Sequence, residues 1–150
     1  MEFSCFYGTK DPYVYLEWVQ QIEEIFDSLK YYDFQKCRIA SRKFFGHAAK
    51  WWKDLMSLRR MIRYSEVRNW EVMKRYIIRH FISQDVRDKF YVKLQKLKQC
   101  DEMCIDGYIK KFKLFVIASN IGGSERWQVT KFISGLKHEI AKRLEMDVQF

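Results

Sequence analysis

The chain is poor in residues that interrupt helices, with one proline and six glycines among its 150 residues. Because proline and glycine are the strongest breakers of regular structure, this scarcity favours long uninterrupted elements. The longest apolar runs fall well short of the ~20 residues that a membrane-spanning helix needs. The first residues also lack the pattern of a signal peptide. We therefore predict a chain without a membrane segment and expect a cytoplasmic location.

Residues that build metal sites and catalytic sites are also scarce. The four cysteines, at positions 5, 37, 100 and 104, do not form a dense disulfide framework, which favours a reduced, intracellular chain. Cys100 and Cys104 lie close in the sequence, but no histidine or cysteine follows at zinc-knuckle spacing, and two thiols cannot complete a tetrahedral zinc site. No phosphate-binding glycine loop or catalytic triad pattern stands out. We expect no metal, no cofactor, no small-molecule substrate and no enzymatic activity.

Acidic residues are fewer than basic ones, 19 against 28, so the formal net charge is +9. The excess is spread over both halves of the chain, without a basic tail. This balance favours weak, salt-sensitive contact with RNA or DNA, although a solvated helical surface rich in Lys and Arg has the same composition. Any nucleic-acid binding is therefore expected to be electrostatic and tolerant of sequence.

Apolar side chains, by contrast, are abundant and recur at helical spacing. Hydrophobic residues make up 48% of the chain and aromatic residues 17%, which is enough for a packed core. The first predicted helix begins at Asp11-Pro12, since proline suits a first turn. Its apolar stripe comprises Tyr15, Leu16, Val19, Ile22, Phe26 and Leu29. A second helix is predicted from its cap Asp33 through Phe45, burying Cys37, Ala40 and Phe44.

Two further helices complete the first half of the chain. Gly46 ends the second helix and permits a tight turn into the third. The stripe of the third helix comprises Ala48, Trp52 and Leu55. Residues 59–65 are predicted to form a polar connection, and Asn69 is predicted to cap the fourth helix. The stripe of the fourth helix comprises Trp70, Met73, Ile77 and Phe81.

The second half holds four more predicted helices and no convincing pair of strands. The segments expected between these helices and before them are 83–85, 98–103 and 120–123. Asp85 and Ser124 are the expected caps of the fifth and seventh helices, and Gly135 is expected to end the seventh. The fold class predicted from these patterns is all-α, in two small helical lobes.

Several landmarks stand at fixed offsets along most of the chain. They are Phe6-x-Gly8-x-x-Asp11-Pro12, Leu16-x-Trp18, Gly46-x-Ala48-x-x-Trp51-Trp52, Trp70-x-x-Met73-Lys74, Phe81, Gln99, Tyr108-x-x-x-Phe112 and Phe132-x-x-Gly135-Leu136. Together these patterns resemble the capsid region of the gag polyprotein of gypsy-class LTR retrotransposons. The resemblance extends from Phe6 to about Leu144.

The resemblance implies an N-terminal capsid lobe over residues 1–83 and a C-terminal lobe over 84–150. It also implies a structural protein that self-associates into virus-like particles around the RNA of the element. The zinc knuckle, protease and polymerase regions of such elements are not in the sequence. A truncated or decayed gag, or a fragment of a polyprotein, is therefore expected.

The alternative is a gag-derived module that a host has reused as a dimerising adaptor. A DNA-binding helix-turn-helix is a third reading, weakened by the long connection between its candidate helices.

Gln99, Tyr108 and Phe112 resemble the major homology region of retroviral and retrotransposon capsids. In that motif the glutamine forms a hydrogen bond within a turn, and aromatic side chains pack beneath it. Three residues depart from the family pattern, and the first is Ser83, which stands after the Phe81 region where a proline is common. Cys100 replaces a glycine, which would cause strain if the turn needed a positive φ, and Gly107 replaces an acidic residue at a helix start.

The tryptophan pair Trp51-Trp52 has two interpretations. Packing in a helical core is the one we favour, and stacking of an exposed ring on a nucleic-acid base is the alternative. We expect Trp18, Trp52, Tyr108 and Phe112 to be mostly buried, because each lies on the apolar stripe of its helix.

Overall fold

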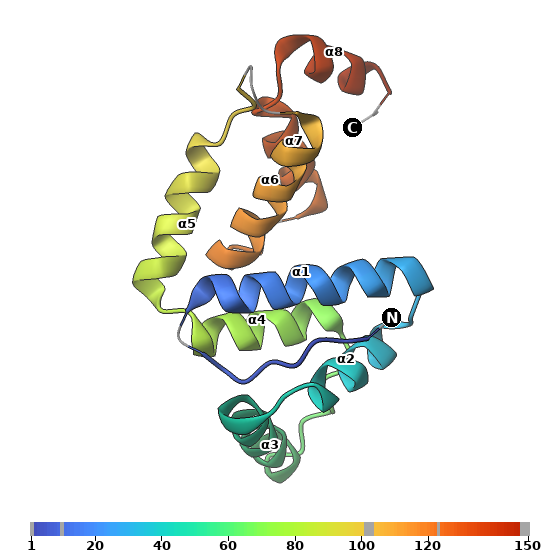
Figure 1. The fold of residues 1–150 in the computed structure, drawn as a ribbon, viewed down its shortest axis with the longest axis vertical. Coiled ribbons are helices and arrows are strands. Elements are labelled where there is room, and N and C mark those ends of the chain that lie inside the picture. The colour runs from blue at the N-terminus through green and yellow to red at the C-terminus, as the bar shows by residue number, and fades with distance from the viewer. Residues whose placement is uncertain (1, 10, 101–103, 123, 148–150) are drawn as a thin grey trace. The chain divides into compact units, whose positions relative to one another are not determined.

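The computed structural model describes residues 2–9, 11–100, 104–122 and 124–147, and it contains eight α-helices (Figure 1). No strand occurs within these described residues, and Phe6 and Phe44 form an isolated parallel β-bridge. The predicted all-α class is confirmed. The chain divides into two compact units, Met1–Ser83 and Gln84–Phe150.

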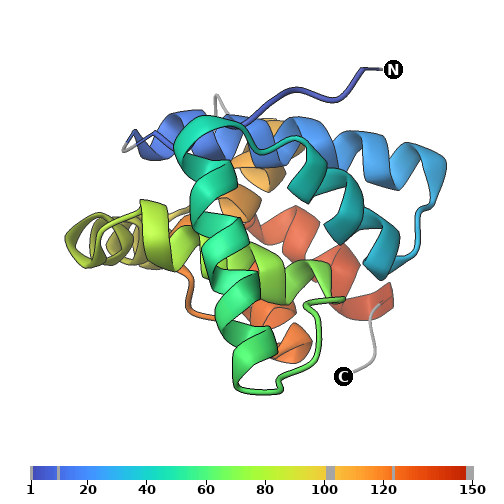
Figure 2. The ribbon, with the colours of Figure 1, turned by 90° about the horizontal axis from the view of Figure 1, so that it is seen from below.

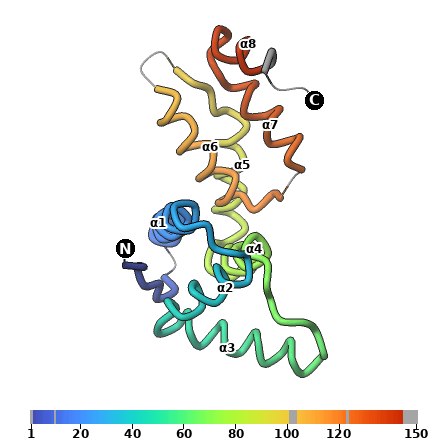
Figure 3. The backbone as a smooth tube through the Cα atoms, turned by 90° about the vertical axis from the view of Figure 1, so that its right-hand side faces the viewer, coloured from blue at the N-terminus to red at the C-terminus, as the bar shows by residue number. Residues whose placement is uncertain are grey.

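The first unit contains α1 (Pro12–Leu29), α2 (Asp33–Arg42), α3 (Gly46–Met61) and α4 (Trp70–Phe81). Helices α1 and α4 lie side by side, and α3 lies on the far side of the unit from α1 (Figures 1 and 3). Seen from below, α3 runs across the direction of α4 (Figure 2). The core lies between α1, α2 and α4, because these three helices supply most of the buried side chains of the unit.

Two of the predicted helix starts are confirmed by their capping bonds. The carboxylate of Asp11 accepts a hydrogen bond of 2.9 Å from the backbone N–H of Tyr13, and Pro12 is the first helical residue. The side chain of Asn69 accepts a bond of 3.1 Å from the N–H of Val72. Each cap satisfies an N–H that has no partner inside its helix.

The end of the first helix differs from the prediction. Leu29 was predicted to lie on the buried stripe, but 53% of its surface is exposed. The reason is local, since Lys30 takes a left-handed conformation with φ of 51° and turns the chain away from the helix axis. The remaining predicted stripe residues of this helix are buried.

The second helix also ends earlier than predicted, at Arg42 instead of Phe45. The backbone after it pairs with the extended segment that precedes α1. The N–H of Phe6 donates to the carbonyl of Lys43 at 2.8 Å, and the N–H of Phe45 donates to the carbonyl of Phe6 at 2.9 Å. These bonds replace helical ones, so the helix stops. Cys37, Ala40 and Phe44 are buried as predicted.

The third helix continues to Met61, through part of the segment 59–65 that was predicted to be a connection. Arg59 explains the stability of this last turn. Its guanidinium donates to the carbonyl of Ser65 and to the hydroxyl of Tyr76, each at 2.7 Å. The arginine thus joins the end of α3 both to the loop that follows and to α4.

The second unit contains α5 (Gln84–Lys96), α6 (Ile105–Ser119), α7 (Glu125–Ser134) and α8 (His138–Asp147). Helices α5 and α6 pack along each other (Figures 1 and 3). The buried apolar side chains of this unit are Phe90, Leu94, Tyr108, Phe112, Ala118, Ile133 and Leu136. Ser124 caps α7 as predicted, because its hydroxyl accepts a bond of 3.1 Å from the N–H of Trp127.

Two boundaries in the second unit differ from the prediction. Helix α5 begins at Gln84, so Asp85 lies in its first turn instead of capping it. Helix α6 begins at Ile105, and the sulfur of Cys104 caps it by accepting a bond of 3.4 Å from the N–H of Gly107. The predicted turn and loop include residues 101–103 and 123, which lie outside the described residues.

Candidate functional site

The extended segment before α1 carries the first landmark residue into the core of the first unit. Phe6 is only 1% exposed. Its ring centroid lies 5.4 Å from that of Tyr15, 5.3 Å from Trp18, 5.8 Å from Phe44 and 5.2 Å from Phe81. Aromatic pairs at such separations add to the stability that burial provides. One side chain therefore ties α1 and α4 to the segment after α2.

Gly8 and Ala48 bring two landmarks into contact. Gly8 has a φ of +82°, and a Cβ there would lie 2.9 Å from both the backbone nitrogen of Ala48 and a ring carbon of Phe81. The N–H of Ala48 donates to the carbonyl of Tyr7 at 3.2 Å. Only glycine fits this close approach, since a side chain would be both strained and obstructed. Gly46, which begins α3, also has a positive φ, of +56°.

The tryptophans of the first unit fall into two groups. Trp18 and Trp70 are buried, and the indole N–H of Trp18 donates to the carbonyl of Ser4 at 2.9 Å. Trp51 and Trp52 are only partly exposed, so Trp52 is mostly covered, as predicted, but it is not fully buried. Ala48 is the only buried residue among the described side chains of α3. The helix thus packs through its first turn, which leaves both rings of the pair at the edge of the core.

Trp51 stacks on a histidine of α4. Its ring centroid lies 4.7 Å from that of His80 with 16° between the planes, and His80 lies 6.1 Å from His47. Partial burial lowers the pKa of His80, and the neighbouring His47 lowers it further. His80 is therefore expected to be neutral near pH 7, so the rings pack together without a charge between them.

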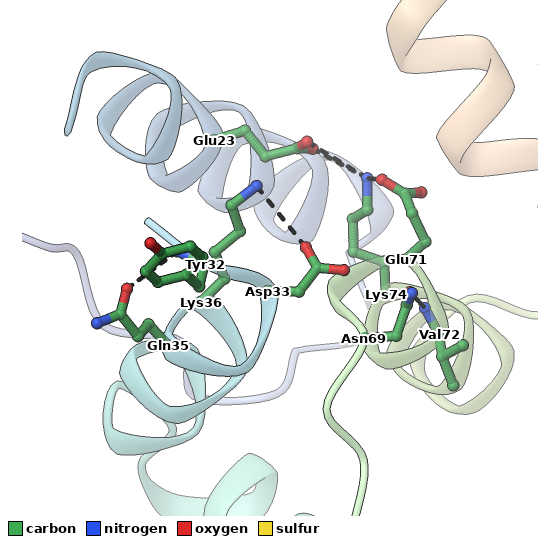
Figure 4. Close-up of polar contacts among 9 residues, drawn as sticks. All are labelled: Glu23, Tyr32, Asp33, Gln35, Lys36, Asn69, Glu71, Val72 and Lys74. Carbon is green, nitrogen blue, oxygen red and sulfur yellow. Dashed lines mark hydrogen bonds and ion pairs between the residues drawn. The ribbon is translucent and has the colours of Figure 1, made fainter. Parts of the chain in front are cut away.

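A buried lysine joins α4 to α1 in the first unit (Figure 4). Lys74 of α4 is 6% exposed, and its ammonium lies 3.3 Å from both carboxylate oxygens of Glu23 on α1 and 2.9 Å from Glu71. Burial raises the pKa of Glu23, and Lys74 opposes that shift by charge and by hydrogen bonding. The ion pair therefore offsets the cost of placing these charges inside the unit.

Replacing Lys74 by methionine should raise the pKa of Glu23 further, because the burial would remain while the cation is lost. A carboxyl whose folded pKa is raised contributes stability below its unfolded pKa, and this contribution is lost as the pH rises through the folded pKa. Lys74→Met should therefore lower the free energy of unfolding by roughly 1–3 kcal/mol near pH 7, and by much less near pH 4. The loss at pH 7 is smaller than that for a fully buried ion pair, because Glu23 is partly exposed.

Urea unfolding at the two pH values and an NMR titration of the Glu23 carboxyl measure both effects. Glu71→Gln is the matched control, because Glu71 contacts the same ammonium from a more exposed position. An equal loss of stability at both pH values would rule out the electrostatic account.

In the second unit, the turn that contains Gln99 is joined to the junction of α7 and α8. The N–H of Gln99 donates to the carbonyl of Gly135 at 2.7 Å, and its side-chain oxygen accepts from the N–H of Lys137 at 3.1 Å. The hydroxyl of Tyr108 donates to the carbonyl of Phe132 at 2.7 Å. We call Gln99, Tyr108, Phe132 and Gly135 the Gln99 clamp.

The Gln99 clamp brings together landmarks that stand far apart in the sequence. Tyr108 and Phe112 are buried as predicted, and the ring of Phe132 lies about equally close to both, at 5.1 and 5.2 Å. The resemblance implied that Gln99 forms a hydrogen bond within its own turn, but its side chain bonds instead to the junction of α7 and α8. No local pattern could indicate this bond, since its partner lies 38 residues away. Cys100 does not have a positive φ, so the strain predicted there is absent.

Neither a metal site nor a membrane span is found in the described part of the chain. Within those residues, no group of three or more His, Cys, Asp or Glu side chains could hold a metal ion. The same residues contain no helix that is long and apolar enough to cross a bilayer.

Comparison with known proteins adds a family assignment for the first unit. Residues 1–82 match the family described as the N-terminal capsid-like domain of the retrotransposon-derived protein PEG10. No match was found among curated proteins. Among solved structures, the chain is similar to the dARC1 capsid domain dimer, with 22% identity over 98% of this chain and 86% of that chain. The TM-score is 0.45.

Proposed function

Because this chain belongs to the family of N-terminal capsid-like domains of the retrotransposon-derived protein PEG10, we propose that it is a structural gag capsid of a gypsy-class LTR retrotransposon. In this proposal the chain self-associates into virus-like shells around the RNA of the element. The observation that carries it is the match over residues 1–82, which coincides with the first unit, Met1–Ser83, to within one residue.

The second unit is proposed to be the C-terminal capsid lobe. Gln99, Tyr108 and Phe112, the three residues that resemble the major homology region, support this assignment, because Gln99 forms side-chain and backbone hydrogen bonds at its turn and both aromatic side chains are buried. The clamp is structural in character. It holds α6 against the junction of α7 and α8, and so sets the shape of the surface that this unit presents.

Exposed apolar side chains on both units support self-association. Tyr32, Met61 and Tyr64 are exposed on the first unit, and Tyr91 and Val92 on the second. Contacts through such side chains can each be weak, because many simultaneous contacts in a shell make the whole assembly strong.

Sedimentation velocity over a range of protein concentrations tests the proposal. Oligomers are expected to grow with concentration, and salt or single-stranded RNA should promote them, because a chain of net charge +9 repels its own copies. RNA affinity itself should fall by orders of magnitude between roughly 50 and 200 mM salt if several phosphates are contacted.

Negative-stain microscopy of the same samples would reveal closed or curved particles. A chain that stays monomeric at high concentration, with and without RNA and at every salt concentration, would contradict the proposal.

A further inference from the structure

The first helix of this basic chain carries no basic residue. The sequence of α1 contains four acidic residues, Glu17, Glu23, Glu24 and Asp27, and neither lysine nor arginine. Glu23 turns inward to Lys74. The exposed side of the helix is formed by Tyr13, Val14, Glu17, Gln21, Glu24 and Asp27, which we call the acidic face.

The exposed side of α3 has the opposite charge. It is formed by Lys50, Lys53, Leu58, Arg60 and Met61, followed by Arg63 after the helix, and we call this set the basic face. Asp54 is the acidic side chain among them. Leu58 and Met61 are 49% and 74% exposed, so the basic face also carries exposed apolar surface.

The two helices that carry these faces lie on opposite sides of the first unit. Helix α1 borders one side and α3 the other, as two perpendicular views show (Figures 1 and 3). Within one copy of the unit, the acidic face therefore cannot reach the basic face. Their charges remain available to another molecule.

We propose that the acidic face of one copy docks on the basic face of the next copy. This inference rests on the proposed self-association and identifies the surfaces that make one of its contacts. A second copy fits because its basic face, on α3, carries the charge that complements the acidic face on α1 of the first copy. Contact between two basic faces, or between two acidic faces, would bring like charges together.

The chemistry of the two faces suits such a contact. Glu17 and Glu24 would lie opposite Lys53 and Arg60, and Val14 would cover apolar surface on the neighbouring copy. Because the two surfaces differ, the contact is head-to-tail, and it can repeat from copy to copy. Repetition of this kind yields rings or open arrays, which a shell requires, whereas a two-fold contact stops at a dimer.

A charge swap tests the proposal directly. Glu17→Lys/Glu24→Lys reverses the acidic face, and Lys53→Glu/Arg60→Glu reverses the basic face. Each double variant alone should weaken self-association by at least roughly tenfold, since like charges then meet in the contact. An equimolar mixture of the two should associate again. Both faces of the first variant are then basic and both faces of the second are acidic, so a contact between the two variants joins opposite charges.

The quadruple variant, with both swaps in one chain, is the decisive control. Its net charge equals that of the parent, so restored association would show that complementarity matters and total charge does not. Arg38→Glu/Arg42→Glu on α2 lowers the net charge as much as the basic-face swap does, outside both faces, and should leave the contact intact.

The outcomes distinguish this inference from the proposed function. If the parent associates and the mixture and quadruple variant do not, the assignment of faces is wrong, and the proposed function stands. If the parent is monomeric under all conditions, the proposed function fails and this inference fails with it. Circular dichroism checks folding, and the milder Glu→Gln and Lys/Arg→Gln pairs replace any swap that unfolds, with a smaller expected loss.

Discussion

Replacing Phe6 by alanine is expected to lower the free energy of unfolding of the first unit by about 3–5 kcal/mol, the range for truncating a buried aromatic side chain. Phe6 is 1% exposed, and its ring contacts aromatic rings from both α1 and α4. The expected loss is large because the cavity would open at the centre of this cluster. Its rigid rings can fill the space only by shifting the helices that carry them.

Urea unfolding followed by tryptophan fluorescence measures this loss, since Trp18 packs against the Phe6 ring. Trp52→Ala is the matched control, and it should cost less because Trp52 is less deeply buried than Phe6. A loss below ~1 kcal/mol for Phe6→Ala would mean that the extended segment is not part of the stable unit in solution.

Replacing Gly135 by alanine is expected to destabilise the second unit by roughly 2–4 kcal/mol, although its φ of −93° suits any residue. The reason is steric. A Cβ at this position would overlap the hydroxyl of Tyr108 and lie 2.7 Å from the carbonyl oxygen of Leu97. Relief of the overlap would break the bond from Tyr108 to Phe132, which leaves a buried hydroxyl without its partner.

A second substitution separates the two contributions. Removing the hydroxyl with Tyr108→Phe should recover part of the stability of Gly135→Ala, so the effects of the two changes should not be additive. Gly107→Ala in the first turn of α6 is the control, and it should be neutral or gain up to about 1 kcal/mol from helix propensity. If Gly135→Ala unfolds at the same urea concentration as the parent, the close packing of the Gln99 clamp is absent in solution.

Local features of the fold could be predicted from the sequence alone. Asp11, Asn69 and Ser124 cap their helices through bonds that span two or three residues, so the information lies within a single turn. The apolar spacing of α1 and α4 likewise placed most buried side chains correctly, because a long helix with one apolar stripe has one way to face a core.

The positions of helix ends and of half-buried rings depended on contacts between distant segments. Helix α2 ends at Arg42 because the backbone after it pairs with Phe6, a residue that lies before α1 in the sequence. Trp52 lies on a helical stripe, but α3 packs through Ala48 and its first turn, so the stripe is only partly covered. Helical periodicity indicates which side of a helix is apolar, and not how much of that side a neighbour will cover.

Surfaces show the same division between local pattern and tertiary structure. Reading α1 along the chain shows that it lacks basic residues, and reading α3 shows that it is rich in them. Only the tertiary structure places the two helices on opposite sides of one unit, where their charges cannot neutralise each other (Figures 1 and 3). Likewise, Gln99 and Gly135 are landmarks of the sequence, but the fold alone decided that they bond, because hydrogen bonds between distant segments require the packing of whole helices.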